Sequence, residues 1–124
     1  MSRAKREGFR IGLDLRLKGA GGRAFGPGRA ELLERIDRLG SISAAAREMG
    51  MSYRHAWLLL EYTNRAFGVR VVDTIQGGSR GGGAVLTTPG RRILRIYGRM
   101  LRDAERIFRD ELAALSDLAR RPAD

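Results

Sequence analysis

Hydrophobic and polar positions follow two different periods along the first third of the chain. Apolar residues occupy every second position from Phe9 to Leu17, which predicts a half-buried β-strand. The glycine-rich segment from Lys18 to Gly28 predicts a loop. From Arg29 to Leu39 the apolar residues recur every three or four positions, so we expect an amphipathic helix that ends at Gly40.

Two further helices are predicted close together. Ser43 can cap a short helix that Gly50 ends, and Ser52 can cap a helix from Tyr53 to about Phe67 that ends at Gly68. Because three residues, Gly50-Met51-Ser52, join the two helices, their spacing and turn chemistry are those of a helix-turn-helix.

A hairpin is predicted after this pair of helices. The β-branched run Val69–Ile75 and the short apolar run Ala84–Thr87 flank a glycine-rich tip. Two such runs around a turn are typical of paired antiparallel strands. We therefore expect a wing over about residues 69–87.

The last helix is predicted over about residues 89–119, with Thr88 as its cap and Pro89 in its first turn. A helix of roughly 30 residues is roughly 45 Å long, whereas a domain of this size is only about 35 Å across. Its near-heptad apolar stripe therefore predicts a second chain and a homodimer. The expected dimer-interface residues are Leu94, Tyr97, Leu101, Ala104, Phe108, Leu112 and Leu115.

Together these elements predict a mainly α fold with a small antiparallel sheet. The order strand, helix, helix-turn-helix, hairpin and long helix is that of a winged helix-turn-helix with a long C-terminal dimerisation helix. We expect residues 1–124 to form a single domain.

Composition narrows the function. The 124 residues include no Cys, one His, and 24 Lys plus Arg against 14 Asp plus Glu, a formal net charge of +10. The absence of Cys excludes disulfides and thiolate metal sites, and no catalytic motif or metal cluster appears, so we expect neither an enzyme nor a cofactor. No apolar run is long enough for a membrane span and no secretory signal is present, which favours a cytoplasmic protein. The positive charge favours a polyanionic partner, foremost double-stranded DNA.

The candidate DNA contacts lie where a winged helix would meet DNA. The major groove admits one α-helix, whose N-terminal side chains reach the base edges. Arg54 can contact a guanine, Arg80 at the wing tip can reach the backbone or minor groove, and Arg91 is a phosphate candidate. His55 can equally bind a phosphate, a neighbouring side chain or a base, and Trp57 can instead pack. The full candidate set is Ser43, Ser52, Tyr53, Arg54, His55, Trp57, Ser79, Arg80, Gly81, Gly82 and Arg91.

Three stretches carry a family resemblance: Gly40–Ala46, Met51–Trp57 and Gly77–Thr87. With them the chain, from about Phe9 to Ser116, resembles the DNA-binding half of the molybdate-responsive transcriptional regulators, the ModE family, and is distantly similar to the LysR-type winged helix. The resemblance implies a dimer held by the first and last helices that binds a palindromic operator, and a link to molybdenum metabolism.

One departure from that family matters. Its molybdate-sensing members carry a C-terminal pair of barrel-like domains, whereas this sequence stops at Asp124. We therefore expect no molybdate ligand and no other small-molecule ligand in this chain, and we favour a natural short protein over an excised domain.

The sequence thus predicts a sequence-specific transcriptional regulator that acts as a homodimer. Two alternatives stay open. The net charge alone would also suit a non-specific architectural DNA-binding protein, and the missing sensor domains would suit a DNA-binding partner of a separate sensor protein.

Overall fold

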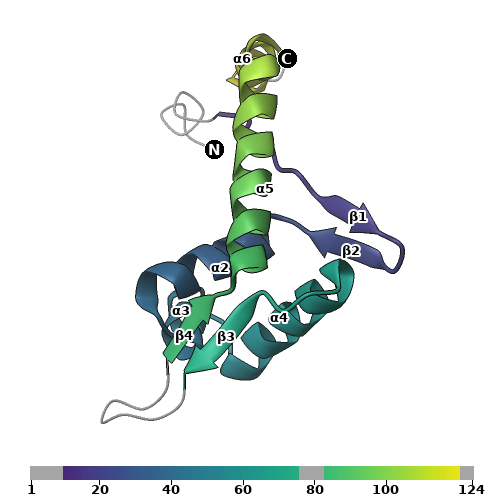
Figure 1. Cartoon of the computed structure of the whole chain (residues 1–124). Coiled ribbons are helices and arrows are strands. Elements are labelled where there is room, and N and C mark those ends of the chain that lie inside the picture. Colours follow the sequence, from purple (N-terminus) through teal and green to yellow (C-terminus); the bar gives the residue numbers. More distant parts are fainter. Residues whose placement is uncertain (1–9, 76–82, 121–124) are drawn as a thin grey trace. The chain divides into compact units, whose positions relative to one another are not determined.

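The computed structural model describes residues 10–75 and 83–120. Contacts between Cα atoms divide the chain into two units, one of Leu15–Tyr97 and the other of residues up to Asp14 together with those from Gly98 onward. Within the described residues there are five helices and two two-stranded antiparallel sheets (Figure 1). The mainly α expectation is confirmed, with two small sheets in place of one. The elements are β1 Leu17–Gly19, β2 Gly22–Phe25, α2 Pro27–Leu39, α3 Ile42–Glu48, α4 Tyr53–Phe67, β3 Val72–Ile75, β4 Gly83–Leu86, α5 Thr88–Ile107 and α6 Arg109–Arg120.

The predicted long first strand and the predicted loop after it are both wrong in part. Residues 10–16 form no strand, although burial does alternate from Ile11 to Leu17 as the pattern predicts. The strand β1 is confined to Leu17–Gly19, where β2 supplies a hydrogen-bonding partner, and the register runs from Leu17 opposite Phe25 to Gly19 opposite Gly22. Gly22 has φ 113°, a conformation that only glycine adopts readily.

Glycines follow the ends of α2 and α4 as predicted, but the N-terminal cap of α3 differs from the prediction. Gly40 and Gly68 adopt left-handed conformations directly after α2 and α4. The Ser52 side chain accepts a hydrogen bond from the His55 backbone N–H, which confirms it as the cap of α4. Ser41, not Ser43, caps α3, because its Oγ accepts from the Ala44 backbone N–H at 3.0 Å.

The helix α2 contributes several buried side chains to the core of the Leu15–Tyr97 unit. Ile36 is fully buried, and Phe25 of β2 packs edge-to-face against Phe67 and Tyr97, at centroid distances of 6.0 and 5.0 Å. The Tyr97 hydroxyl donates to the Leu15 carbonyl oxygen at 2.6 Å. The start of α5 is therefore part of this core.

Two hydrogen bonds hold the β3–β4 hairpin, one directly before β3 and one near the start of β4. The Val71 backbone N–H donates to Asn64 Oδ1 of α4 at 2.9 Å, and the Ala84 backbone N–H donates to the Gly40 carbonyl oxygen after α2 at 2.9 Å. The residue before β3 is thus tied to α4, and β4 is tied to the C-terminal cap of α2.

The helix α5 begins at Thr88 and not after it. The cap is Thr87, whose Oγ1 accepts from the Gly90 backbone N–H at 3.0 Å and donates to the Arg70 carbonyl oxygen at 2.6 Å. The expected cap at Thr88 is therefore wrong by one residue. Thr87 is the residue three positions before Gly90, whose N–H has no carbonyl partner within the helix.

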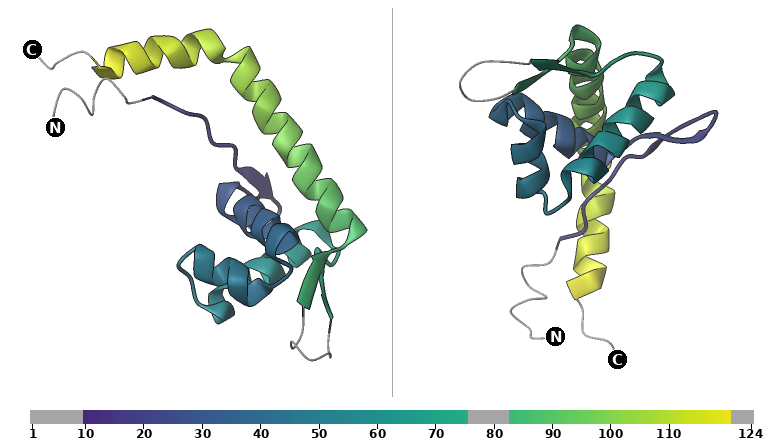
Figure 2. Two further views of the ribbon diagram at one scale, coloured as in Figure 1. Left: turned by 90° about the vertical axis from the view of Figure 1, so that its left-hand side faces the viewer. Right: turned by 90° about the horizontal axis from the view of Figure 1, so that it is seen from below.

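The predicted single long helix is interrupted. The helix α5 ends at Ile107, and α6 begins at Arg109 after one residue in turn conformation. The helical path changes direction between them (Figure 2, left), although neither proline nor glycine lies there. In this unit the Ile11 backbone N–H donates to Ser116 Oγ at 2.9 Å. Among the described residues, no helix combines the length and apolar character that crossing a bilayer requires.

Candidate nucleic-acid interface

The first turn of α4 presents three adjacent side chains to solvent. Tyr53, Arg54 and His55 are exposed, while Ala56 and Leu60 on the other side of the helix are buried. The apolar side anchors the helix and leaves the Ser52-capped end outward. This arrangement brings together four of the predicted contacts, and a helix N-terminus with an arginine suits negatively charged groups.

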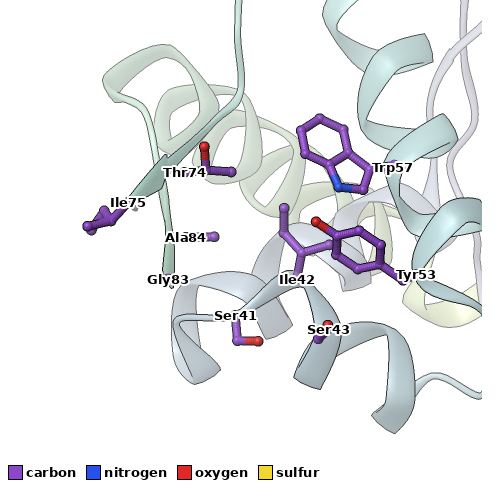
Figure 3. Close-up of a pocket in the computed structure, with 9 residues that line it drawn as sticks. All are labelled: Ser41, Ile42, Ser43, Tyr53, Trp57, Thr74, Ile75, Gly83 and Ala84. Atoms are coloured by element: carbon purple, nitrogen blue, oxygen red, sulfur yellow. The ribbon is translucent and has the colours of Figure 1, made fainter. Parts of the chain in front are cut away.

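A cleft of about 320 Å³ opens beside this turn, between α3, α4 and the hairpin. Tyr53 and Trp57 of α4 form an edge-to-face pair with centroids 6.3 Å apart, and they are 50% and 37% exposed. Figure 3 shows these rings facing Thr74 and Ala84 of the hairpin across the cleft. Trp57 therefore lines the cleft and also packs edge-to-face against Tyr53, so the two roles left open for it in the sequence do not exclude each other.

Hydroxyl groups surround the cleft. Ser41 and Ser43 of the α3 end and Thr74 of β3 line it, with buried Ile42 between the serines. Hydroxyls bind phosphate oxygens, and apolar surfaces contact sugars and the thymine methyl group. The cleft can therefore accept part of a nucleic-acid strand. Ser43 contributes here without being the helix cap.

The charges around this surface differ in how far they are neutralised. Arg91 forms an ion pair with Asp37, at 2.8 Å between Nη1 and Oδ1, so its expected role with phosphate competes with that carboxylate. In the ranges that the structure describes, Arg54 has no ion pair. Arg54 is thus the available cation at the α4 end.

An ion-pair cluster joins α2 to α3. Glu48 pairs with Arg35 and with Arg38, at 2.7 Å to the latter, and Arg35 also pairs with Glu31. The hydrogen bond from Arg38, with the positive charges of Arg38 and Arg35, lowers the pKa of Glu48. The hydrogen bond to Glu31 is the largest influence that raises the pKa of Arg35.

The predicted wing-tip contacts Ser79, Arg80, Gly81 and Gly82 lie outside the described residues, and their role stays a prediction. The last described residues on either side of this tip, Ile75 of β3 and Gly83 of β4, line the cleft beside α4.

The predicted dimer-interface residues divide into two groups. Leu94 packs against the core of its own chain and Tyr97 is 4% exposed, so the Tyr97 side chain is a core group of a single chain. The other five are half-buried or exposed: Leu101, Ala104, Phe108, Leu112 and Leu115.

Several residues that line the cleft were not predicted from the sequence. Ser41, Thr74 and Ala84 come from three separate elements, and only the fold brings them together. The two serines of Ser41-Ile42-Ser43 could have indicated that both hydroxyls lie on one side of the chain. That inference requires knowing that Ile42, between them, is buried. The part of the chain that is described contains no group of three or more His, Asp or Glu that could hold a metal ion.

Comparison with known proteins finds relatives over part of the chain. The chain is similar to ModE regulators over part of its length. It is 37% identical over 95 residues to the transcriptional regulator ModE of Haemophilus influenzae, covering 74% of this chain and 37% of that protein. With the DNA-binding transcriptional dual regulator ModE of Escherichia coli K12 it shares 37% identity over 82 residues, covering 66% and 31%.

A second group of relatives carries a different name. The molybdenum-pterin-binding protein MopB of Rhodobacter capsulatus is 47% identical over 77 residues, covering 62% of this chain and 28% of MopB. The names of these relatives describe regulators and binding proteins. No family model matches the chain. The chain spans about a third of the length of the curated relatives it matches, so it corresponds to one portion of them.

Proposed function

We propose that this chain is a ModE-like winged helix-turn-helix protein, a sequence-specific transcriptional regulator that binds a palindromic operator as a homodimer. The exposed first turn of α4 carries the proposal, because Arg54 without an ion pair stands beside the Tyr53–Trp57 cleft. In this reading α4 enters the major groove and β3–β4 is the wing. The similarity to ModE regulators supports it, and the similarity to a molybdenum-pterin-binding protein extends it to genes of molybdenum metabolism.

Selection of bound duplexes from a random pool tests sequence specificity. We expect an inverted repeat with half-sites about one helical turn apart, or a multiple of it. Fluorescence anisotropy on the recovered site then compares Arg54→Ala with Arg102→Ala, an exposed arginine of α5. Arg54→Ala should cost about 1–3 kcal/mol and relax specificity, whereas Arg102→Ala should leave the preference intact.

Equal affinity for selected and random duplexes at physiological salt would refute the specific reading. It would favour the architectural alternative, since phosphate attraction by the net charge of +10 needs no sequence.

The proposed dimer rests on apolar side chains that α5 and α6 leave uncovered. Ile107, Phe108, Leu115 and Leu118 are all exposed, and a second copy would remove them from water. Leu115→Glu should convert the dimer to a monomer in analytical ultracentrifugation. Ala113→Glu adds the same charge at an exposed position on the opposite side of α6, about 160° away, and should leave the dimer intact. An unchanged mass for Leu115→Glu would contradict this interface.

A further inference from the structure

A second cleft lies at the other end of α4, away from the proposed DNA-reading turn. It has a volume of about 480 Å³ and is lined by the Gly19–Gly22 turn, Arg23, Arg29, Tyr62 and Arg65. Tyr62 follows Tyr53 by nine residues, which places it about 14 Å further along the helix. The cleft is therefore a separate site with its own chemistry.

Arg29 is held in place at this cleft. Its Nη1 donates to the carbonyl oxygens of Arg23 and Ala24, at 3.0 and 2.9 Å, and its guanidinium lies 5.9 Å from the centre of the Tyr62 ring. These partners orient the guanidinium and carry no full negative charge. Among the described residues Arg29 forms no ion pair. Its half-buried guanidinium is therefore held in position without a carboxylate to neutralise it.

Two further cations share the cleft with weak or no compensation. Arg65 is 3.9 Å from Glu61, between Nη2 and Oε2, and both side chains are largely exposed, so that pair contributes little. Arg23 is exposed and has no ion pair within the described ranges. Three guanidinium groups against one distant carboxylate give a concave surface of positive potential.

We propose that this cleft binds a phosphate group, supplied either by the DNA backbone outside the operator core or by a free phosphorylated small molecule. The planar guanidinium fork matches phosphate oxygens, and the Tyr62 hydroxyl is a further donor. Gly19, Gly21 and Gly22 leave the arginines uncovered because they have no side chains. The DNA source rests on the proposed function, whereas the free-phosphate source does not.

Titration of the protein with inorganic phosphate, without DNA, tests the cleft directly. We expect saturable ¹⁵N–¹H NMR shifts at the Gly19–Gly22 backbone amides. The double variant Arg23→Gln/Arg65→Gln should weaken phosphate binding about tenfold or more. It retains Arg29, which holds β2 through the Arg23 and Ala24 carbonyl oxygens. The control Arg99→Gln/Arg106→Gln removes the same charge from two exposed arginines near Asp103 and should bind phosphate as the unmodified protein does.

Two duplexes then separate the sources, one limited to the selected operator core and one extended by about ten base pairs on each side. If Arg23→Gln/Arg65→Gln weakens only the extended complex and lowers the salt slope by about one, the DNA backbone supplies the phosphate. If phosphate binding is lost while both duplexes bind normally, the ligand is a free phosphorylated molecule. If the cleft variant and the control behave alike in both assays, the proposal is overturned. Failure of all sequence-specific binding would refute the regulator function, but the phosphate titration would still report on the cleft.

Discussion

Gly90→Ala is the substitution whose effect the structure constrains most tightly. Gly90 lies buried in the first turn of α5, and a Cβ there would be 2.2 Å from the Val71 carbonyl oxygen and 3.0 Å from its carbonyl carbon. Val71 cannot retreat easily, because its N–H is bonded to Asn64 and its carbonyl oxygen accepts from the Thr87 N–H at 3.0 Å. The clash is therefore with backbone that two hydrogen bonds hold.

The net effect follows from opposing contributions. Alanine favours a helix interior over glycine by about 1 kcal/mol. Overpacking against a fixed neighbour costs about 1–3 kcal/mol, occasionally more, and loss of a backbone hydrogen bond adds about 1 kcal/mol. We therefore expect Gly90→Ala to lower the free energy of unfolding by about 1–3 kcal/mol, and the melting temperature by roughly 4–8 °C per kcal/mol.

Thermal and urea denaturation measure this change, with Gly98→Ala as the matched control in the same helix. A Cβ at Gly98 would have Arg102 Nη1, the end of a flexible side chain, as its nearest neighbour at 3.2 Å. Gly98→Ala should therefore be neutral or stabilising. A Gly90→Ala protein as stable as the unmodified chain, or an equal loss in both variants, would refute the packing of α5 against Val71.

Three further predictions concern helix contacts. Asn64→Ala leaves a buried backbone N–H without its acceptor and should cost about 1–3 kcal/mol in urea denaturation; a loss below the measurement error would contradict that bond. Ser41→Ala should cost about 1 kcal/mol, whereas Ser43→Ala should not, because only Ser41 caps α3; the reverse order of melting temperatures would restore the sequence-based assignment. The lowered pKa of Glu48 means that its ion pairs stabilise the fold above the ordinary glutamate pKa and are lost as pH falls through the lowered value. Glu48→Gln should therefore flatten the dependence of stability on pH below about 4.3, and a curve that overlays the unmodified one would rule this out.

The helices could be predicted because their ends carry strong local signals. Gly40, Gly50 and Gly68 all adopt left-handed backbone conformations, with φ between 66° and 69°. The Ser52 side chain accepts a hydrogen bond from the backbone N–H of His55, three residues further on. These signals depend on neighbouring residues alone. They predicted where α3 ends and where α4 begins, and hence the exposed turn at Tyr53.

Elements that depend on distant partners could not be predicted in the same way. Alternation over residues 9–17 reports burial of one side of the chain, and it does not reveal whether a neighbouring strand is present to pair with it. The β1–β2 hairpin was hidden because glycines occupy the strands themselves, and burial of Phe25 in the core fixes its position. The interruption after Ile107 has no proline or glycine to announce it.

The double attachment of the β3–β4 hairpin sets a limit on the DNA that the proposed regulator could accept. Because Asn64 of α4 holds Val71 directly before β3, and the Gly40 carbonyl oxygen after α2 holds Ala84 of β4, a movement of the hairpin relative to α4 would strain these bonds. Inserting one base pair between the segments that these two elements touch would displace them by about 3.4 Å along the duplex axis. Following that displacement would strain these two bonds, so we expect operators to tolerate base changes there better than changes in length.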